Sequence, residues 1–464
     1  MFRTSTRPSL SLRRQLAEWC RQQKVIRAVY SALAARPLRA RLHALQLRQL
    51  LSRHAFVRTE SWNRIVPAAR VPSRAVQGDV HGVNIAGYLR GEFGLAESAR
   101  MYARALIAAQ VPVALYDLEL GVPHSMADAS LEGMFTTDLP ERVVIIFINP
   151  DYFAAAVREI GEAKLRGKYV IACWFWELEH LPATWLPVLE QVDELLVASH
   201  FIGDAVRRCS NIPLLHAPIP LADMNRADVG REEFGMQTGS FSFLVTFDFN
   251  SWIERKNPQA VIQAFRRAFP AGDEQVQLLI KTSNGHLHGE LLKSLVSQVS
   301  DDPRILIRND VISHEQLTAL QVSCDAYVSL HRAEGFGMGL AECMQLGKPV
   351  IATGWSGNME FMHAGCAALV DYELVPIKAG QYPFGEGQRW AEPDVSHAAR
   401  WMARLAGDRA EAAKIGELGR LHVEAVLCPT RVVDMLLARM KELNTRLPES
   451  AGIPPNFDAQ RGEQ

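Results

Sequence analysis

The sequence contains no apolar run of the roughly 20 residues that a membrane-spanning helix needs. It also lacks the uninterrupted apolar core of a signal peptide near its start, because Glu18, Arg21, Lys24 and Arg27 divide the apolar residues there. Its seven cysteines are scattered, and no two have the short spacing of a zinc knuckle or a redox pair. Scattered free thiols are typical of a reducing compartment, so we expect a cytoplasmic protein.

Net charge is also nearly absent, at -1 over 464 residues, which argues against a nucleic-acid partner. The charge is unevenly distributed, because residues 1–80 hold 16 Lys and Arg against three acidic residues, a net charge of about +13. Apolar residues recur among these arginines at helical spacing, which predicts a basic helical N-terminal extension. Two interpretations remain open: helices packed on the body of the protein, or peripheral contact of residues 1–75 with an anionic membrane at the inner face of the plasma membrane.

From residue 81 onward, short apolar segments alternate with amphipathic stretches of helical periodicity. The predicted strands are 83–86, 111–115, 143–148, 169–172 and 194–198, and then 243–247, 276–281, 305–308, 326–330, 349–352 and 367–370. This alternation predicts an α/β fold with two Rossmann-like, doubly wound domains that face each other across a ligand-binding cleft. The expected organisation is a first domain at 81–220, a second at 221–428, a C-terminal helix at 429–448 that packs back toward the first domain, and a flexible tail at 449–464.

A glycine-rich turn between a predicted strand and a predicted helix is the most informative segment: Glu334-Gly-Phe-Gly-Met-Gly-Leu-Ala-Glu342. The free N–H groups at the start of such a helix form a phosphate-binding site. Glu334 lies just before the helix, where a carboxylate meets a sugar, and Glu342 lies one turn inside, where it accepts hydrogen bonds from a ribose. A dinucleotide-binding turn would need its third glycine at Leu340, so that alternative fails, whereas a purely structural turn remains open.

Two further segments of the second half carry polar groups at strand ends. Arg255 and Lys256 lie in a strand-to-helix loop and suit a diphosphate, although a solvated basic corner is the alternative. Ser356 and Asn358 follow the predicted strand 349–352 and offer hydrogen bonds to a sugar, unless the segment is a simple turn. His331, close to Glu334, is either a contact to the sugar or leaving phosphate or a structural histidine.

The first half supplies two candidate segments of its own. A glycine-rich loop that opens a helix makes Gly94 a candidate for close approach to a ligand. An aromatic stretch after a strand suits carbohydrate stacking and acceptor recognition, and buried packing between domains is an equal alternative. Its candidate residues are Trp174, Trp176, Glu177 and His180.

Together these segments resemble the family 4 (group 1) retaining glycosyltransferases of the GT-B fold, from about residue 81 to 440. The resemblance rests on the paired Glu334 and Glu342 with the Glu-Gly-Phe-Gly core. It implies that Glu342 binds the nucleotide ribose and that Glu334 contacts the transferred sugar. It further implies sugar and phosphate contacts by the backbone of Phe336, Gly337, Met338 and Gly339. Arg255 and Lys256 resemble the family's phosphate clamp, but the family usually has arginine where this chain has Ser251, which puts the match of the clamp in doubt.

An irregular segment at 381–394 is similar to one in bacterial surface-polysaccharide transferases of the mannosyl or rhamnosyl type, and is interpreted as an edge of the donor pocket or as an ordinary loop. The resemblance implies retaining transfer of a hexose-type sugar from a GDP-, UDP- or dTDP-sugar to a saccharide or lipid-linked saccharide. Glu334, Lys256 and Arg255 would be catalytic. We expect no cofactor and no metal, since no Asp-x-Asp occurs at a strand end. A nucleotide-sugar epimerase of the same fold and a non-catalytic nucleotide-sugar-binding protein remain alternatives.

Overall fold

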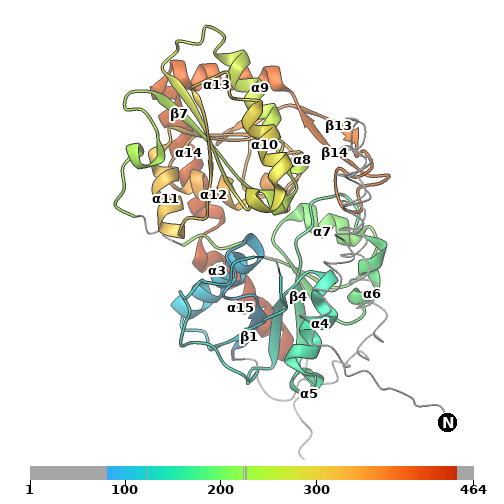
Figure 1. Cartoon of the computed structure of the whole chain (residues 1–464). Coiled ribbons are helices and arrows are strands. Elements are labelled where there is room, and N and C mark those ends of the chain that lie inside the picture. Colours follow the sequence, from blue (N-terminus) through green and yellow to red (C-terminus); the bar gives the residue numbers. More distant parts are fainter. Residues whose placement is uncertain (1–80, 123, 223, 225–226, 447–464) are drawn as a thin grey trace, which may run out of the picture. The chain divides into compact units, whose positions relative to one another are not determined.

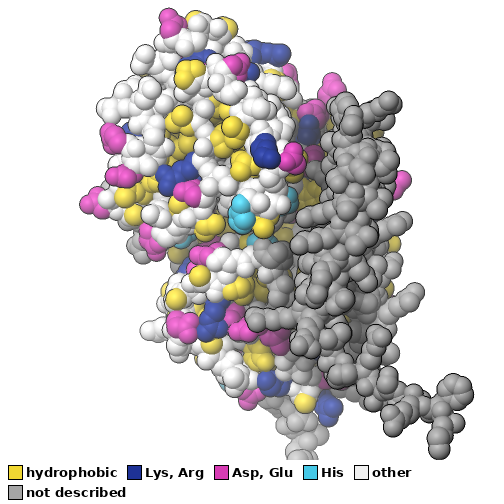
Figure 2. All heavy atoms as spheres, viewed as in Figure 1, with side chains coloured by type: hydrophobic (Ala, Val, Ile, Leu, Met, Phe, Trp, Pro, Cys, Tyr) yellow, Lys and Arg dark blue, Asp and Glu magenta, His cyan; other side chains and the backbone are white. Residues whose placement is uncertain are grey.

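The structure is a computed structural model that describes residues 81–446 except 123, 223, 225 and 226 (Figure 1). The predicted basic extension, its proposed membrane contact and the predicted tail therefore lie outside the described residues. Within the described part of the chain, we find no helix whose length and hydropathy would suit it to cross a bilayer. On the face drawn in Figure 2, acidic and basic side chains of the described residues are interspersed.

The first domain is built on a six-stranded parallel sheet with the order β2-β1-β3-β4-β5-β6. Its strands are β1 Val83–Gly87, β2 Val113–Asp117, β3 Val143–Phe147, β4 Tyr169–Cys173, β5 Glu194–Val197 and β6 Leu214–His216. Its helices are α3 Gly94–Ala108, α4 Pro150–Ile160, α5 Glu162–Leu165, η1 Ala183–Trp185, α6 Leu186–Leu189 and α7 His200–Arg207. Every residue of β1 and β3 is buried, which explains their apolar sequences. The polar exception in β1, Asn84, donates to the carbonyls of Glu141 and Val143 at 2.7 and 2.8 Å.

The second domain has its own six-stranded parallel sheet, with the order β12-β11-β10-β7-β8-β9. Its strands are β7 Phe241–Asp248, β8 Val276–Ser283, β9 Ile305–Asn309, β10 Ala326–Ser329, β11 Val350–Thr353 and β12 Ala368–Val370. Its helices are η2 Arg231–Phe234, η3 Phe249–Ser251, α8 Ile253–Lys256, α9 Pro258–Ala268, η4 Gly285–His288, α10 Gly289–Ser297, α11 His314–Ser323, α12 Met338–Gln345, η5 Gly357–Glu360, α13 Val395–Gly407 and α14 Arg409–Val426. The two sheets confirm the prediction of an α/β protein with two Rossmann-like domains.

Two details of the predicted elements differ from the structure. The strand expected at 111–115 lies at 113–117, where Pro112 precedes it and uses its carbonyl to accept the N–H of Val83 at 3.0 Å. The segment at 381–394 is not irregular throughout, because β14 (Arg389–Pro393) pairs antiparallel with β13 (Tyr372–Pro376). The buried side chain of Trp390 fixes this hairpin, and the Arg332 guanidinium lies 5.2 Å from its ring.

The last described helix, α15 (Pro429–Arg446), returns the chain from the second domain to the first. It contacts α3, beside which it lies in Figure 1. Arg439 of α15 pairs with the buried carboxylate of Glu194 in β5 at 3.0 Å. The Leu221 N–H donates to the Leu427 carbonyl at 2.9 Å, so the outgoing and returning chain segments lie side by side.

Candidate active site

The turn between β10 and α12 leaves the first N–H groups of α12 open at its start. Gly337 is the residue before the helix and has a φ of +96°, a left-handed conformation that suits glycine. A Cβ atom at Gly337 would lie 2.7 Å from a methyl carbon of Leu340, and one at Gly339 would lie 3.0 Å from the Tyr327 hydroxyl. No side chain caps this helix, so its first amides and its dipole are available to an anion.

Glu334 lies beside this helix start, between two cations that precede it by 78 and 79 residues in the sequence. Lys256 Nζ is 2.5 Å from Glu334 Oε1, and Arg255 Nη1 is 3.1 Å from Oε2. The Glu334 side chain is 9% exposed. Burial alone would raise the pKa of this carboxyl, but the charges of Lys256 and Arg255 outweigh it and hold the pKa well below its usual range. Glu334 is therefore a fixed anion.

The two cations differ in how they are held. Arg255 donates to the Ala333 carbonyl at 2.8 Å and to the Ser251 carbonyl at 3.2 Å, so its guanidinium is anchored by backbone as well as by charge. Burial lowers the pKa of Arg255, but the nearby carboxylates of Glu334 and Glu177 reverse that and raise it. Burial is the main cause of the lowered pKa of Lys256, and Glu334 opposes it. Among the residues that the structure describes, the Lys256 ammonium donates only to Glu334, which leaves two of its three N–H groups for a further anion.

The loop after β11 holds the backbone of Glu334 in place. Ser356 Oγ accepts the backbone N–H of Glu334 at 2.8 Å, and Ser356 itself has a φ of +79°, a strained conformation for a residue with a side chain. A Cβ atom at Gly357 would lie 2.0 Å from the Gly335 carbonyl oxygen, so only glycine fits between the two loops. The Gly357 N–H also donates to the Glu334 carbonyl at 2.8 Å.

Asn358 and His331 bind each other inside the protein. The Asn358 side chain is fully buried; its amide donates to the Thr353 carbonyl at 3.0 Å and its oxygen lies 3.0 Å from His331 Nε2. His331 Nδ1 lies 3.0 Å from Ser329 Oγ, and burial lowers the pKa of its ring. Both side chains are occupied, so they position the loops around Glu334, and the structural alternative describes His331 better than sugar contact does.

Glu342 points into the protein from α12. Its carboxylate accepts a hydrogen bond from Gln321 Nε2 of α11 at 2.7 Å. Burial raises its pKa. Gln321 could not be identified in advance, because a glutamine in a helix has no distinctive sequence pattern.

The first domain contributes backbone and one side chain to the same site. Gly94 is the first residue of α3, and a Cβ atom there would lie 3.7 Å from the terminal methyl group of Met338, the first residue of α12. Ser199 Oγ donates to the Gly335 carbonyl at 2.7 Å, and the Cβ position of Gly335 is 3.3 Å from the Trp176 carbonyl oxygen. The starts of α3 and α12 therefore approach each other, and the glycine-rich turn is held by both domains.

A carboxylate clasp that the sequence did not predict also joins the domains. Glu360 of η5 accepts the backbone N–H of His200 at 2.8 Å and lies 2.8 Å from the ring Nδ1 of the same residue. Its other oxygen lies 2.9 Å from His216 Nε2. Burial would raise the pKa of Glu360, but the bonds to both histidines outweigh it and lower the pKa.

The aromatic segment of the first domain divides into buried and accessible parts. Trp174 and Trp176 are buried, and each makes an edge-to-face contact with Trp185 of the same domain. The Trp176 ring also lies 6.1 Å from the Tyr382 ring of the second domain, so this tryptophan fits packing between the domains. Glu177 accepts a hydrogen bond from the Tyr382 hydroxyl at 2.7 Å and lies 3.9 Å from Arg255. His180 is exposed, and its backbone joins this segment to the loop before β14: the N–H donates to Gln388 at 3.0 Å.

Removal of the Glu342 carboxylate tests whether this residue holds part of a ligand. We expect Glu342→Ala to weaken nucleotide binding by about 1.5–3 kcal/mol, roughly 10- to 150-fold, because it removes a charge-assisted hydrogen bond. The matched control is Gln321→Ala, which removes the side chain that bonds to Glu342 but leaves the carboxylate. We expect it to lose less nucleotide affinity than Glu342→Ala. Calorimetric titration measures both, and an unchanged dissociation constant for a folded Glu342→Ala variant would remove Glu342 from the site.

The comparisons with known proteins agree with this geometry. Residues 244–377 match the sequence profile of the family described as glycosyl transferases group 1, whereas no curated protein matches the chain. A sucrose-phosphate synthase from Thermosynechococcus elongatus is similar in structure, with a TM-score of 0.56 and 15% identity over 79% of this chain and 100% of that one. Anabaena HepE in complex with UDP and glucose has a TM-score of 0.54 and 12% identity over 78% of this chain and 100% of that one.

A glycosyltransferase from Rickettsia africae is a third structure of this kind, with a TM-score of 0.54 and 12% identity over 78% of this chain and 98% of that one. At such identities the likeness establishes the fold, and the matched family profile covers the part of the second domain that holds Glu334 and Glu342. The protein is a glycosyltransferase with the GT-B fold.

Proposed function

We propose that the protein is a retaining glycosyltransferase that moves a hexose-type sugar from a nucleotide-sugar donor to a saccharide or lipid-linked saccharide acceptor. The observation that carries the proposal is the buried Glu334 carboxylate, held by Lys256 and Arg255 beside the uncapped start of α12. A nucleoside diphosphate sugar has the complementary parts: two phosphates for the cations and helix amides, and a ring of hydroxyl groups for the carboxylate.

The roles of the residues follow from their charges. Amides of Phe336 to Gly339 would bind the phosphate and sugar, and Glu342 would accept hydrogen bonds from the ribose. As the glycosidic bond breaks, negative charge grows on the departing diphosphate, and Lys256 and Arg255 would stabilise it. Glu334 would stabilise the positive charge that grows at the sugar carbon. A departing phosphate oxygen on the same face can take the proton of the acceptor hydroxyl, which accounts for retention without a protein nucleophile.

UDP-sugars are the first donors to test, because one similar structure is a complex of Anabaena HepE with UDP-glucose, at a TM-score of 0.54. GDP- and dTDP-sugars, including GDP-mannose, are the alternatives. We extend the proposal to the cytoplasmic synthesis of a bacterial cell-surface polysaccharide, which rests on the resemblance of the segment at 381–394 and on the basic residues 1–75.

A thermal-shift screen with UDP, GDP, dTDP and ADP and their sugars tests the donor. We expect one nucleotide class to raise the melting temperature, since a ligand at about 100 times its dissociation constant stabilises the folded state by about 2.7 kcal/mol. The bound donor is then incubated with and without acceptor extracts, and the anomeric configuration of the product is read by NMR. An epimer formed from donor alone would favour the epimerase alternative, and binding without any turnover would favour a non-catalytic protein.

A further inference from the structure

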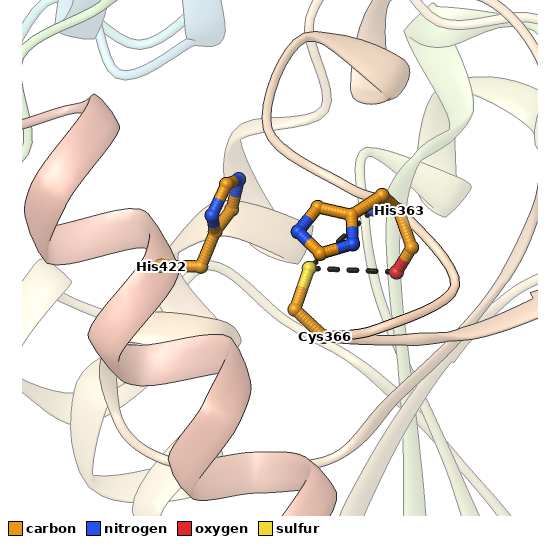
Figure 3. A group of neighbouring side chains, drawn as sticks. All are labelled: His363, Cys366 and His422. Carbon is orange, nitrogen blue, oxygen red and sulfur yellow. Dashed lines mark hydrogen bonds between the residues drawn. The ribbon is translucent and has the colours of Figure 1, made fainter.

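A cysteine and two histidines form a cluster between the loop that follows η5 and helix α14 (Figure 3). His363 and Cys366 belong to the loop that leads into β12, and His422 belongs to α14. The side-chain nitrogen and sulfur atoms that can bind a metal all lie within 4.8 Å of one another. None of the three residues contacts Glu334, its two cations or Glu342 in the described structure, so the proposed transfer reaction does not account for the cluster.

Two glycines of α14 let the helix approach neighbouring backbone: Gly416 packs on the turn after α12, and Gly419 packs on this loop. A Cβ atom at Gly416 would lie 2.0 Å from the Gly347 carbonyl oxygen, and one at Gly419 would lie 3.0 Å from the Cys366 carbonyl oxygen. Residues three apart on a helix are neighbours on one face, so His422 follows Gly419 on the side that approaches the loop. The close backbone contact therefore places the His422 ring beside His363 and Cys366.

The three side chains have few competing partners. The rings of His363 and His422 meet edge to face, with centroids 4.5 Å apart and an interplanar angle of 89°. In Figure 3 one nitrogen of the His363 ring is turned toward His422, and the Cys366 sulfur lies next to the same ring. Cys366 is buried and bonds only weakly to backbone of its own loop, whereas His422 makes no side-chain hydrogen bond to any described residue.

We propose that His363, Cys366 and His422 form a zinc-binding site. A thiolate and two neutral imidazoles are the ligands that Zn²⁺ prefers, whereas Ca²⁺ and Mg²⁺ require oxygen ligands. His363 is exposed, so water has access to the fourth position of a tetrahedral ion, as in other sites with three protein ligands. Binding forms one Zn–S and two Zn–N bonds and releases the thiol proton of Cys366 to solvent.

The site needs a small contraction to bind the ion. Tetrahedral coordination at about 2.0–2.3 Å places ligand atoms roughly 3.3–3.8 Å apart, so the side chains must move closer than their present limit of 4.8 Å. His363 Nδ1 now accepts the Gly365 N–H at 3.0 Å, and this contact has to lengthen when Nδ1 carries the ring proton and Nε2 binds zinc. His363 belongs to an exposed stretch of three residues, 363–365, so its ring can move toward Cys366 and His422.

The expected role of the ion is structural. The loop continues directly from η5, whose Gly357 packs on Gly335 and donates to the Glu334 carbonyl. Zinc would fasten this loop to α14 on the side of the second domain that does not carry Glu334. Its removal should lower the melting temperature and leave the reaction chemistry unchanged.

Titration of the full-length protein with Co²⁺ after treatment with a chelator tests the proposal. A bound Co²⁺–thiolate pair absorbs in the near ultraviolet, and we expect this band to saturate at one ion per chain and to be displaced by Zn²⁺. Cys366→Ser should abolish the band. Because Cys366 is buried and its substitution can disturb folding, His422→Gln is the second variant, and it should weaken Zn²⁺ binding at least about 100-fold with its circular dichroism unchanged. Cys209→Ser and His286→Gln, which change exposed residues elsewhere, are the matched controls and should bind as the parent does.

The proposal fails if the parent protein shows no thiolate band, or if the band survives in Cys366→Ser. It also fails if Cys209→Ser abolishes the band, or if a folded His422→Gln variant binds Zn²⁺ as tightly as the parent. None of these outcomes bears on donor binding, so the zinc site and the proposed transfer reaction are tested separately.

Discussion

Glu334→Gln is expected to lower turnover by about 100-fold or more, while donor affinity changes by less than tenfold. Glutamine keeps the size of the side chain and part of its hydrogen bonding but removes the negative charge. That charge matters most in the transition state, when the sugar carbon becomes positive. The structure adds a second consequence: without the carboxylate, the buried Arg255 and the half-buried Lys256 lose the anion that they share, and Glu177 remains 3.9 Å from Arg255, so the melting temperature should also fall.

The stability effect has to be separated from the catalytic effect. Glu194→Gln is a matched control, because Glu194 is also a buried carboxylate paired with an arginine, and it lies at the contact between β5 and α15. It should lower the melting temperature and leave turnover intact when both variants are assayed below their melting temperatures. Full activity of a folded Glu334→Gln variant would contradict the role assigned to Glu334.

Lys256→Ala is expected to lower turnover by roughly 100-fold, with a smaller change in the Michaelis constant. The Lys256 ammonium has hydrogen-bond donors left after its bond to Glu334, and the departing diphosphate gains charge as the bond breaks. The interaction therefore strengthens between ground state and transition state. Steady-state kinetics with saturating acceptor measures the two constants.

Lys281→Ala is the matched control for loss of a buried lysine. Lys281 is buried in the same domain, where its ammonium donates to the carbonyls of Thr282 and Asp310. Its removal should cost stability and leave turnover nearly unchanged. If Lys256→Ala changed only the Michaelis constant, Lys256 would bind donor equally in ground and transition states and would not be catalytic.

The meeting of Glu334 with Lys256 follows from sequence patterns and sheet topology together. Each residue lies after a predicted strand, and the strands β10 and β7 are parallel neighbours, with Tyr327 opposite Leu244. The carboxyl ends of parallel strands share one edge of a sheet, so residues 78 apart in sequence come together there. The start of α12 was likewise predictable, because Gly337 and Gly339 allow close approach where a strand gives way to a helix.

Contacts between domains could not be predicted in the same way. The Glu360 clasp with His200 and His216 and the hydrogen bond from Tyr382 to Glu177 depend on how two separate sheets are placed, and no local pattern encodes that placement. Burial of Trp174 could not be predicted either, although the residue that covers it, Trp185, belongs to the same domain. Trp174 follows a strand end, as an accessible residue would, but neighbouring Trp185 covers it.

The return of α15 to the first domain has a consequence for how the protein is made. That domain consists of residues 81–216 together with 429–446, so its last helix leaves the ribosome only after the whole second domain has been translated. At about 5–20 residues per second, the intervening stretch of about 200 residues takes on the order of 10–40 s. Throughout that interval the nascent first domain exposes the apolar surface of α3 that α15 later covers. The time for which this surface stays uncovered during synthesis is therefore set by the order of the elements along the chain.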